Sequence, residues 1–146
     1  DLTLEELLEA RELLEVPAAR LAAKRRSPAD LERLHESIPN RPLQLATQEQ
    51  FSLNRDFHSV VIEASRNTLL VIAAQPVFSV LQTHLARSEL GRRFHRAINE
   101  HHRSIAAAIE AGRARAAEQE MRAHLRFLRP FYERAWRYAL SARDRR

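Results

Sequence analysis

The amino-acid sequence predicts an all-α fold, a bundle of six helices. Alanine and leucine are abundant and only 2 of the 146 residues are glycine, a composition that favours helix over sheet. Apolar residues recur every three or four positions, as on the buried face of a helix, whereas the alternation typical of strands never extends over a useful length. The length suits a single compact domain over residues 1–146.

Most of the expected helices have recognisable end signals. Thr3 and Glu6 form a capping box, Pro28 follows Ser27 at the first helical position, and Gly112 is a good C-terminal stop. The expected helices run from Thr3 to about Arg26, from Ser27 to near Pro39, from Thr47 to about Ser65, from an Asn67 cap past Pro76, from about Ser88 to Ala111, and from Gly112 through most of the remainder. Proline inside a helix removes a hydrogen bond, so we expect a kink or break at Pro17 and bends at Pro76 and Pro130.

Composition excludes several classes of protein. The chain has no cysteine, so disulfides and thiolate metal sites are excluded and a cytoplasmic location is expected. The longest apolar run, Leu69 to Ala74, is too short to span a membrane. The net charge of +5 comes from basic residues scattered among acidic ones, which indicates solvated helix surface rather than a DNA-binding face.

Polar residues interrupt the apolar faces at five places. Arg11 lies on the apolar face of the first expected helix, Asn54 and His58 on that of the third, His102 on the fifth and His124 on the sixth. A buried polar group without a partner costs a few kcal/mol, so several together imply that they contact one another or share a ligand.

The spacing of these residues predicts where they meet. Asn54 and His58 are four apart and so lie one turn from each other on one helical face. His102 and His124 flank Gly112, and each lies about 15–18 Å along its own helix from that turn. In an antiparallel hairpin the two imidazoles would face each other, and one contact with the third helix would add His58 and Asn54. The resulting three nitrogens and one amide oxygen suit Zn, Ni, Mn or a similar divalent ion.

Each residue also has a purely structural explanation. A histidine on an apolar face is commonly a core histidine with hydrogen-bond partners, Asn54 could bond backbone, and Arg11 could pair with Glu15 or extend to water. His95 lies seven residues before His102 and could turn toward the same face.

At this point the sequence resembles a known family, the FCD domain, which is the C-terminal sensor of the FadR subfamily of GntR-type regulators. The resemblance spans nearly the whole chain. It is carried by an ordered set of segments: Arg11 to Glu15 followed by Ala18 to Ala23, Asn54 to His58 followed by Ala64 to Asn67, His102 to Ile105 followed by Ala108 to Gly112, and Met121 to Leu125.

The resemblance implies an antiparallel bundle of six to seven helices that forms a homodimer and is not an enzyme. It implies a metal held by Asn54, His58, His102 and His124, with a small carboxylate effector bound beside or onto it. It also implies a winged helix-turn-helix that would contact the DNA operator, which we expect to precede this chain and not to be part of it.

One departure from the family pattern is the amide at Asn54, where aspartate is frequent. Asp56 is rotated by about 200° from that position and should point away. A neutral amide leaves the charge of the ion uncompensated, so our hypothesis is that a carboxylate effector supplies the negative charge, assisted by Arg11.

Two other functions remain open at this stage. Three histidines with open coordination positions could activate water in a metal-dependent hydrolase, although no acidic residue is expected on the same inward faces to act as a base. A metal-free helical adaptor would use the polar residues as a hydrogen-bonded network.

Overall fold

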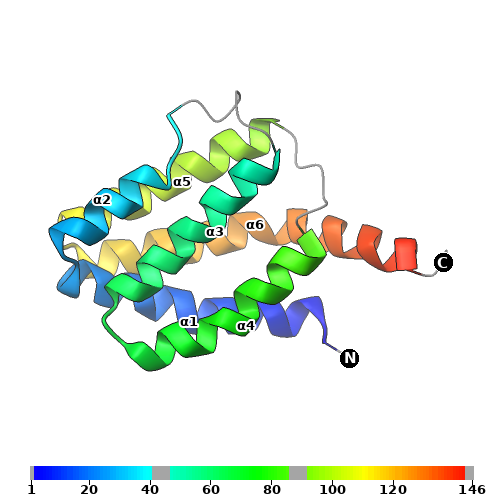
Figure 1. Ribbon diagram of the computed structural model, residues 1–146, viewed down its shortest axis with the longest axis horizontal. Helices are drawn as coiled ribbons and strands as arrows, with labels where there is room; N and C mark the ends of the chain where they lie inside the picture. Colours follow the sequence, from blue (N-terminus) through cyan, green and yellow to red (C-terminus); the bar gives the residue numbers. More distant parts are fainter. Residues whose placement is uncertain (1, 41–46, 86–91, 144–146) are drawn as a thin grey trace.

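A computed structural model describes residues 2–40, 47–85 and 92–143, and within these ranges it contains six α-helices and no strand (Figure 1). This confirms the all-α class. The helices are α1 (Leu4–Arg25), α2 (Pro28–Glu36), α3 (Thr47–Ala64), α4 (Thr68–Leu85), α5 (Arg92–Glu110) and α6 (Ala114–Arg143).

The first two helices begin where the sequence predicts, at capping boxes. The Thr3 side chain accepts a hydrogen bond from the Glu6 N–H while the Glu6 carboxylate accepts one from the Thr3 N–H. Ser27 and Asp30 make the same reciprocal pair at α2. Asn67 caps α4, with its Oδ1 accepting from the Leu69 N–H at 3.1 Å. The expected helix start at Ser88 lies outside the described residues, while α3 starts at Thr47 as expected.

The helices do not break at their internal prolines. α1 continues through Pro17, contrary to the alternative of a break there, and α4 and α6 continue through Pro76 and Pro130. All three prolines are exposed, so the carbonyl that loses its helical hydrogen bond faces water, which can replace the missing donor.

The core is organised around α1, which packs against α3, α4, α5 and α6. The small residues Ala18, Ala19, Ala22 and Ala23 are all buried on α1 and let neighbouring helices approach closely. On the same helix Leu14 and Leu21 are only half-buried, while Glu15 is fully buried. Polar side chains on the inner face of α1 therefore meet several helices at once.

Gly112 turns the chain from α5 into α6. Its φ of +68° is the left-handed conformation that favours glycine, and the Arg113 N–H bonds back to the Ala108 carbonyl at 2.9 Å. Arg26 also contacts this turn, donating from Nη2 to the Glu110 carbonyl at 2.9 Å. The result is the α5–α6 hairpin that the sequence predicts.

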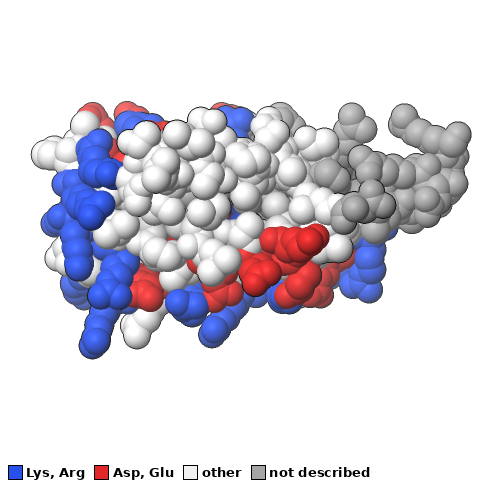
Figure 2. Space-filling model, turned by 90° about the horizontal axis from the view of Figure 1, so that it is seen from below, with Lys and Arg blue, Asp and Glu red and all other residues white. Residues whose placement is uncertain are grey.

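The surface carries most of the charge, as expected; in the view of Figure 2 basic residues gather at the left and recur with acidic ones along the lower edge, and a broad uncharged area lies in the middle. None of the helices in the described part of the chain is long and apolar enough to cross a bilayer.

Replacing Gly112 by alanine should destabilise the domain by roughly 1 kcal/mol, because an L-residue is strained at positive φ. The added Cβ would also lie 3.3 Å from the Arg26 guanidinium, which is flexible enough to move. Urea denaturation measures the effect, with Ala111→Ser, an exposed neighbour, as the control. An unchanged free energy of unfolding in Gly112→Ala would contradict this account of the turn.

Candidate metal centre

Three imidazoles from three helices converge inside the bundle. His58 is on α3, His102 on α5 and His124 on α6, and each is at most 1% exposed. The His124 Nε2 lies 3.2 Å from the His58 Nε2 and 3.3 Å from the His102 Nε2. The potential ligand atoms of all three lie within 4.8 Å of one another, so the central juxtaposition that the sequence predicts is present.

The separations fit a shared divalent ion. Nitrogen ligands about 2.0–2.1 Å from a tetrahedral ion stand about 3.3–3.4 Å apart, close to the two Nε2–Nε2 distances. The His124 Nε2 faces the Nε2 atoms of both His58 and His102. A nitrogen of a neutral imidazole either donates one hydrogen bond or accepts one, so a metal-free network would leave one of these two contacts unsatisfied in a buried site. The converging nitrogens therefore fit a metal better than a closed hydrogen-bonded network.

Burial keeps the imidazoles in the form that binds metal. It lowers the pKa of His102 and of His124 well below the ordinary histidine value, and the neighbouring positive groups lower both pKa values further. The pKa of His58 is also lowered, because burial and Arg11 together outweigh the favourable effect of the Glu15 carboxylate. Neutral imidazoles have a free lone pair, which coordination requires.

A buried carboxylate contacts the first of these histidines from behind. The Glu15 Oε2 makes a short contact with the His58 Nδ1, and both side chains are 1% exposed. Because an ionised carboxylate only accepts hydrogen bonds, the His58 Nδ1 carries the proton and the His58 Nε2 is left with its lone pair facing His124. Glu15 therefore selects the tautomer that a metal needs.

Arg11 neutralises that carboxylate. The Arg11 Nε donates to the Glu15 Oε1 at 2.6 Å, and Arg11 is itself 1% exposed. Burial alone would raise the pKa of Glu15, but the charges of Arg11 and His58 outweigh it and lower the pKa to about 2. Burial would lower the pKa of Arg11, but Glu15 and Tyr132 raise it. The pair is fully ionised and adds no net charge to the site.

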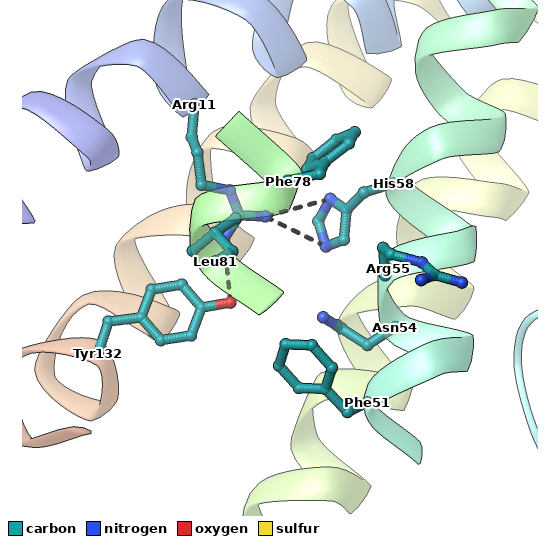
Figure 3. Close-up of a pocket in the computed structure, with 8 residues that line it drawn as sticks. All are labelled: Arg11, Phe51, Asn54, Arg55, His58, Phe78, Leu81 and Tyr132. Atoms are coloured by element: carbon teal, nitrogen blue, oxygen red, sulfur yellow. Dashed lines mark hydrogen bonds between the residues drawn. The ribbon is translucent and has the colours of Figure 1, made fainter. Parts of the chain in front are cut away.

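A pocket opens on one side of this cluster (Figure 3). Its lining includes Arg11 from α1, Asn54 and His58 from α3, and Tyr132 from α6, with apolar walls from α3 and α4. The cavity is small, about 20 Å³, which is room for about one water molecule. The Arg11 guanidinium lies between His58 and Tyr132, donating to the Tyr132 hydroxyl at 3.0 Å.

Asn54 lies one turn from His58 and points into the pocket (Figure 3). Its Oδ1 is buried and makes no hydrogen bond to any described residue. Within the described part of the chain, this oxygen therefore does not make the backbone hydrogen bond that the purely structural explanation required. An unsatisfied amide oxygen is a suitable ligand for a hard divalent cation.

The sequence missed two members of the site. Glu15 was considered only as a partner of Arg11, and the expectation that no acidic residue faces inward is wrong. The spacing of Leu7, Arg11 and Glu15 was the available signal, since four-residue steps continue one helical face. Tyr132 lies eight residues after His124 on the inner face of α6, beyond a proline at which a bend was expected.

The other histidine that could have turned inward does not join the cluster. His95 is 8% exposed, and its ring lies 5.9 Å from that of Phe94. The alternative in which Arg11 extends to water is also wrong, because the guanidinium is buried against Glu15.

Comparison with known proteins identifies the family. The model of the FCD domain matches residues 6–127. The chain belongs to the FCD domain family. It is 33% identical over 127 residues to the Uxu operon regulator of Haemophilus influenzae, covering 82% of this chain and 47% of that protein. It is 32% identical over 130 residues to the HTH-type transcriptional regulator LutR of Bacillus subtilis, covering 82% and 58%.

A third relative, the putative L-lactate dehydrogenase operon regulatory protein of Escherichia coli, is 32% identical over 130 residues, which is 84% of this chain and 49% of that protein. The FCD chain spans about half the length of these curated relatives. All three are named as regulators and none as an enzyme, in agreement with a regulatory domain rather than a hydrolase. The resemblance to the sensor domain of GntR-type regulators is confirmed, while assignment to the FadR subfamily stays a prediction.

The metal-free domain should lose stability as the pH falls below about 6.5, the ordinary pKa of histidine. Below that pH the histidines of the unfolded chain take up protons, whereas the buried imidazoles of the folded chain stay neutral. Because the unfolded state then binds more protons, the free energy of unfolding decreases as the pH falls. A second loss follows between pH 4.5 and about 2, the unfolded and folded pKa values of Glu15. Urea denaturation in the presence of a chelator measures the upper window. Equal stability at pH 8 and pH 5.5 would contradict the neutral, buried state of the histidines.

Proposed function

We propose that this FCD domain senses a small carboxylate effector through a bound divalent metal and thereby controls DNA binding by a transcription regulator. The observation that carries the proposal is the convergence of three buried, neutral imidazoles from three helices, with Nε2–Nε2 separations of 3.2 and 3.3 Å. In this proposal the DNA-binding segment lies elsewhere in the regulator, and two copies of the chain act together.

The proposed metal ligands are His58, His102, His124 and Asn54. Imidazole nitrogens suit zinc and nickel, and the amide oxygen also admits manganese. A bound ion would supply a positive charge that attracts a carboxylate. Since Glu15 is already neutralised by Arg11 and Asn54 is uncharged, the protein leaves that charge unbalanced, which favours an anionic ligand.

The proposed effector site is the pocket beside Asn54 and His58. Its cavity volume of about 20 Å³ is room for about one water molecule, so an acid can bind there only if side chains that line the pocket move. Arg11 uses part of its five N–H groups on Glu15 and Tyr132, so a donor remains for an incoming carboxylate. The name of the Escherichia coli relative, which mentions an L-lactate dehydrogenase operon, makes L-lactate a suitable first probe.

The site can couple a ligand to helix positions because its residues come from different helices. Arg11 is on α1, His58 on α3, His102 on α5 and His124 on α6. An acid held between them would favour the arrangement in which these helices approach one another. The bound acid shifts the equilibrium between two helix arrangements only by the difference between its affinities for them.

A hydrolase remains the less favoured alternative on chemical grounds. Among the described acidic residues, Glu15 is the one that contacts the imidazoles. Its pKa of about 2 makes it a poor base near neutral pH. Its oxygens are also engaged by Arg11 and His58.

Zinc titration by calorimetry tests the metal site. We expect one ion per chain in the wild type, and loss of at least about tenfold in affinity in His102→Ala and His124→Ala, since each removes one ligand. His35→Ala is the matched control because that imidazole is exposed, at 56%. Equal affinities in all four proteins would contradict the proposal.

Glu15→Gln should weaken zinc binding by about 10–100-fold, the usual effect of removing a partner that orients a metal-bound histidine. The amide no longer enforces the His58 tautomer and leaves the Arg11 charge unpaired. Glu9→Gln, at an exposed position of the same helix, is the control. The proposed role of Glu15 fails if the two variants bind zinc equally well.

Asn54→Asp tests the charge hypothesis for the effector. The added carboxylate should tighten zinc binding and weaken binding of L-lactate to the zinc-loaded domain, because the ion then needs less charge from the effector. L-lactamide, which has the same shape without the charge, should bind neither protein well. If metal and L-lactate both bind more tightly to the variant, the hypothesis is wrong.

A further inference from the structure

Tyr132 brings a hydroxyl group into the pocket from the second half of α6. Its side chain is 4% exposed, and it lines the pocket together with Arg11 and His58. Figure 3 shows the hydroxyl directed at the Arg11 guanidinium, whose Nη1 donates to it at 3.0 Å. The match to the family model ends at residue 127, so membership of the FCD family assigns no role to Tyr132.

The Tyr132 hydroxyl keeps a proton that it can donate. A phenol both donates and accepts hydrogen bonds, whereas a guanidinium only donates, so the hydroxyl is the acceptor in its contact with Arg11. The hydroxyl makes no other hydrogen bond to any described residue. A buried donor without an acceptor is costly, and in a native structure it calls for an explanation such as a ligand.

Arg11 supplies a second donor next to this hydroxyl. Its Nε and Nη2 donate to Glu15, and one N–H of Nη1 donates to Tyr132. Nη1 has two N–H groups, and the second one has no acceptor within the described ranges. The Arg11 Nη1 and the Tyr132 hydroxyl oxygen are 3.0 Å apart. Two donors at this separation suit the two oxygens of one carboxylate, as in charge-assisted pairs with two parallel hydrogen bonds.

The rest of the pocket lining favours an anion. None of the eight side chains that line it is acidic, two of them are arginines, and three are large and apolar. Surroundings of low polarity strengthen a hydrogen bond to a charged group. The Glu15 carboxylate contacts the site from behind, but its oxygens are engaged by Arg11 and His58. An acceptor for Tyr132 must therefore come from a ligand.

The pocket has to widen before an acid can enter, since its cavity of about 20 Å³ holds about one water molecule. Phe51 and Phe78 line the pocket and are half-buried, so we expect their rings to turn toward water when the acid binds. Arg11 is held by Glu15 and by Tyr132. The two donors therefore stay in place while the apolar walls move.

We propose that Tyr132 donates a hydrogen bond to the carboxylate of the effector and, with Arg11, forms a two-donor clamp for that group. The inference rests on the proposed function, because it takes the effector to be a carboxylate, and it deepens that function by naming the residues that contact the carboxylate. The clamp selects a group with two acceptor oxygens. A carboxamide presents an N–H to one of the two donors, so the clamp discriminates against it.

Calorimetric titration of the zinc-loaded domain with L-lactate tests the clamp. Tyr132→Phe should raise the Kd for L-lactate by roughly tenfold or more, because it removes a hydrogen bond to a charged group. Its affinity for zinc should equal that of the wild type, since the hydroxyl is not a metal ligand. Tyr138→Phe, the same chemical change at the other tyrosine of the chain, is the control and should bind L-lactate as the wild type does.

Replacing Tyr132 by 3-fluorotyrosine separates a contact with the acid from a purely structural role. The fluorine withdraws electrons, so the hydroxyl becomes a stronger donor and a weaker acceptor. If the hydroxyl donates to the acid, the Kd for L-lactate should fall severalfold at pH 6.5, where the phenol stays protonated. If the hydroxyl only holds Arg11 as an acceptor, the Kd should rise or stay the same.

The outcomes also distinguish this inference from the proposed function. A wild type that binds zinc but no L-lactate would contradict both the carboxylate-sensing function and the clamp. A wild type that binds L-lactate no more tightly than a folded Tyr132→Phe variant, or a 3-fluorotyrosine protein with an equal or higher Kd, would overturn the clamp alone. Circular dichroism checks that each variant is folded, and the 3-fluorotyrosine protein decides the question if Tyr132→Phe is not.

Discussion

A carboxylate and a guanidinium buried side by side set the conditions for the rest of the site. Taking charges out of water costs several kcal/mol per ion unless they are paired with good geometry. Arg11 and Glu15 meet that requirement through contacts at 2.6 and 3.3 Å. Because Arg11 neutralises its charge, Glu15 stays ionised and accepts a hydrogen bond from the His58 Nδ1–H. The His58 Nε2, which lies toward His124, therefore keeps its lone pair.

The sequence predicted much of the fold because its helix ends are strongly marked. Thr3, Ser27, Asn67 and Gly112 act through contacts with residues two to four positions away, so local sequence contains the whole signal. The prolines were harder to interpret, because their effect depends on whether the lost hydrogen bond faces water. Whether that carbonyl faces water depends on which side of the helix is covered by neighbouring helices.

The site was partly predictable for a related reason. His58, His102 and His124 could be identified because each interrupts an apolar face, and the Gly112 turn fixes the register between the last two. Glu15 could not be distinguished from a surface glutamate by pattern alone. Its burial depends on the exact rotation of α1, on the charge of Arg11 and on an imidazole from α3, which are relations between distant parts of the chain.

The most direct test of the central claim is X-ray absorption spectroscopy of the zinc-loaded domain at the zinc edge. Three imidazoles sharing one ion predict nitrogen or oxygen neighbours at about 2.0–2.1 Å with the multiple scattering of about three imidazole rings. The signal should fall by one ring in His124→Ala. A spectrum with one imidazole or none, or one that His124→Ala leaves unchanged, would contradict a shared ion at the centre of the bundle.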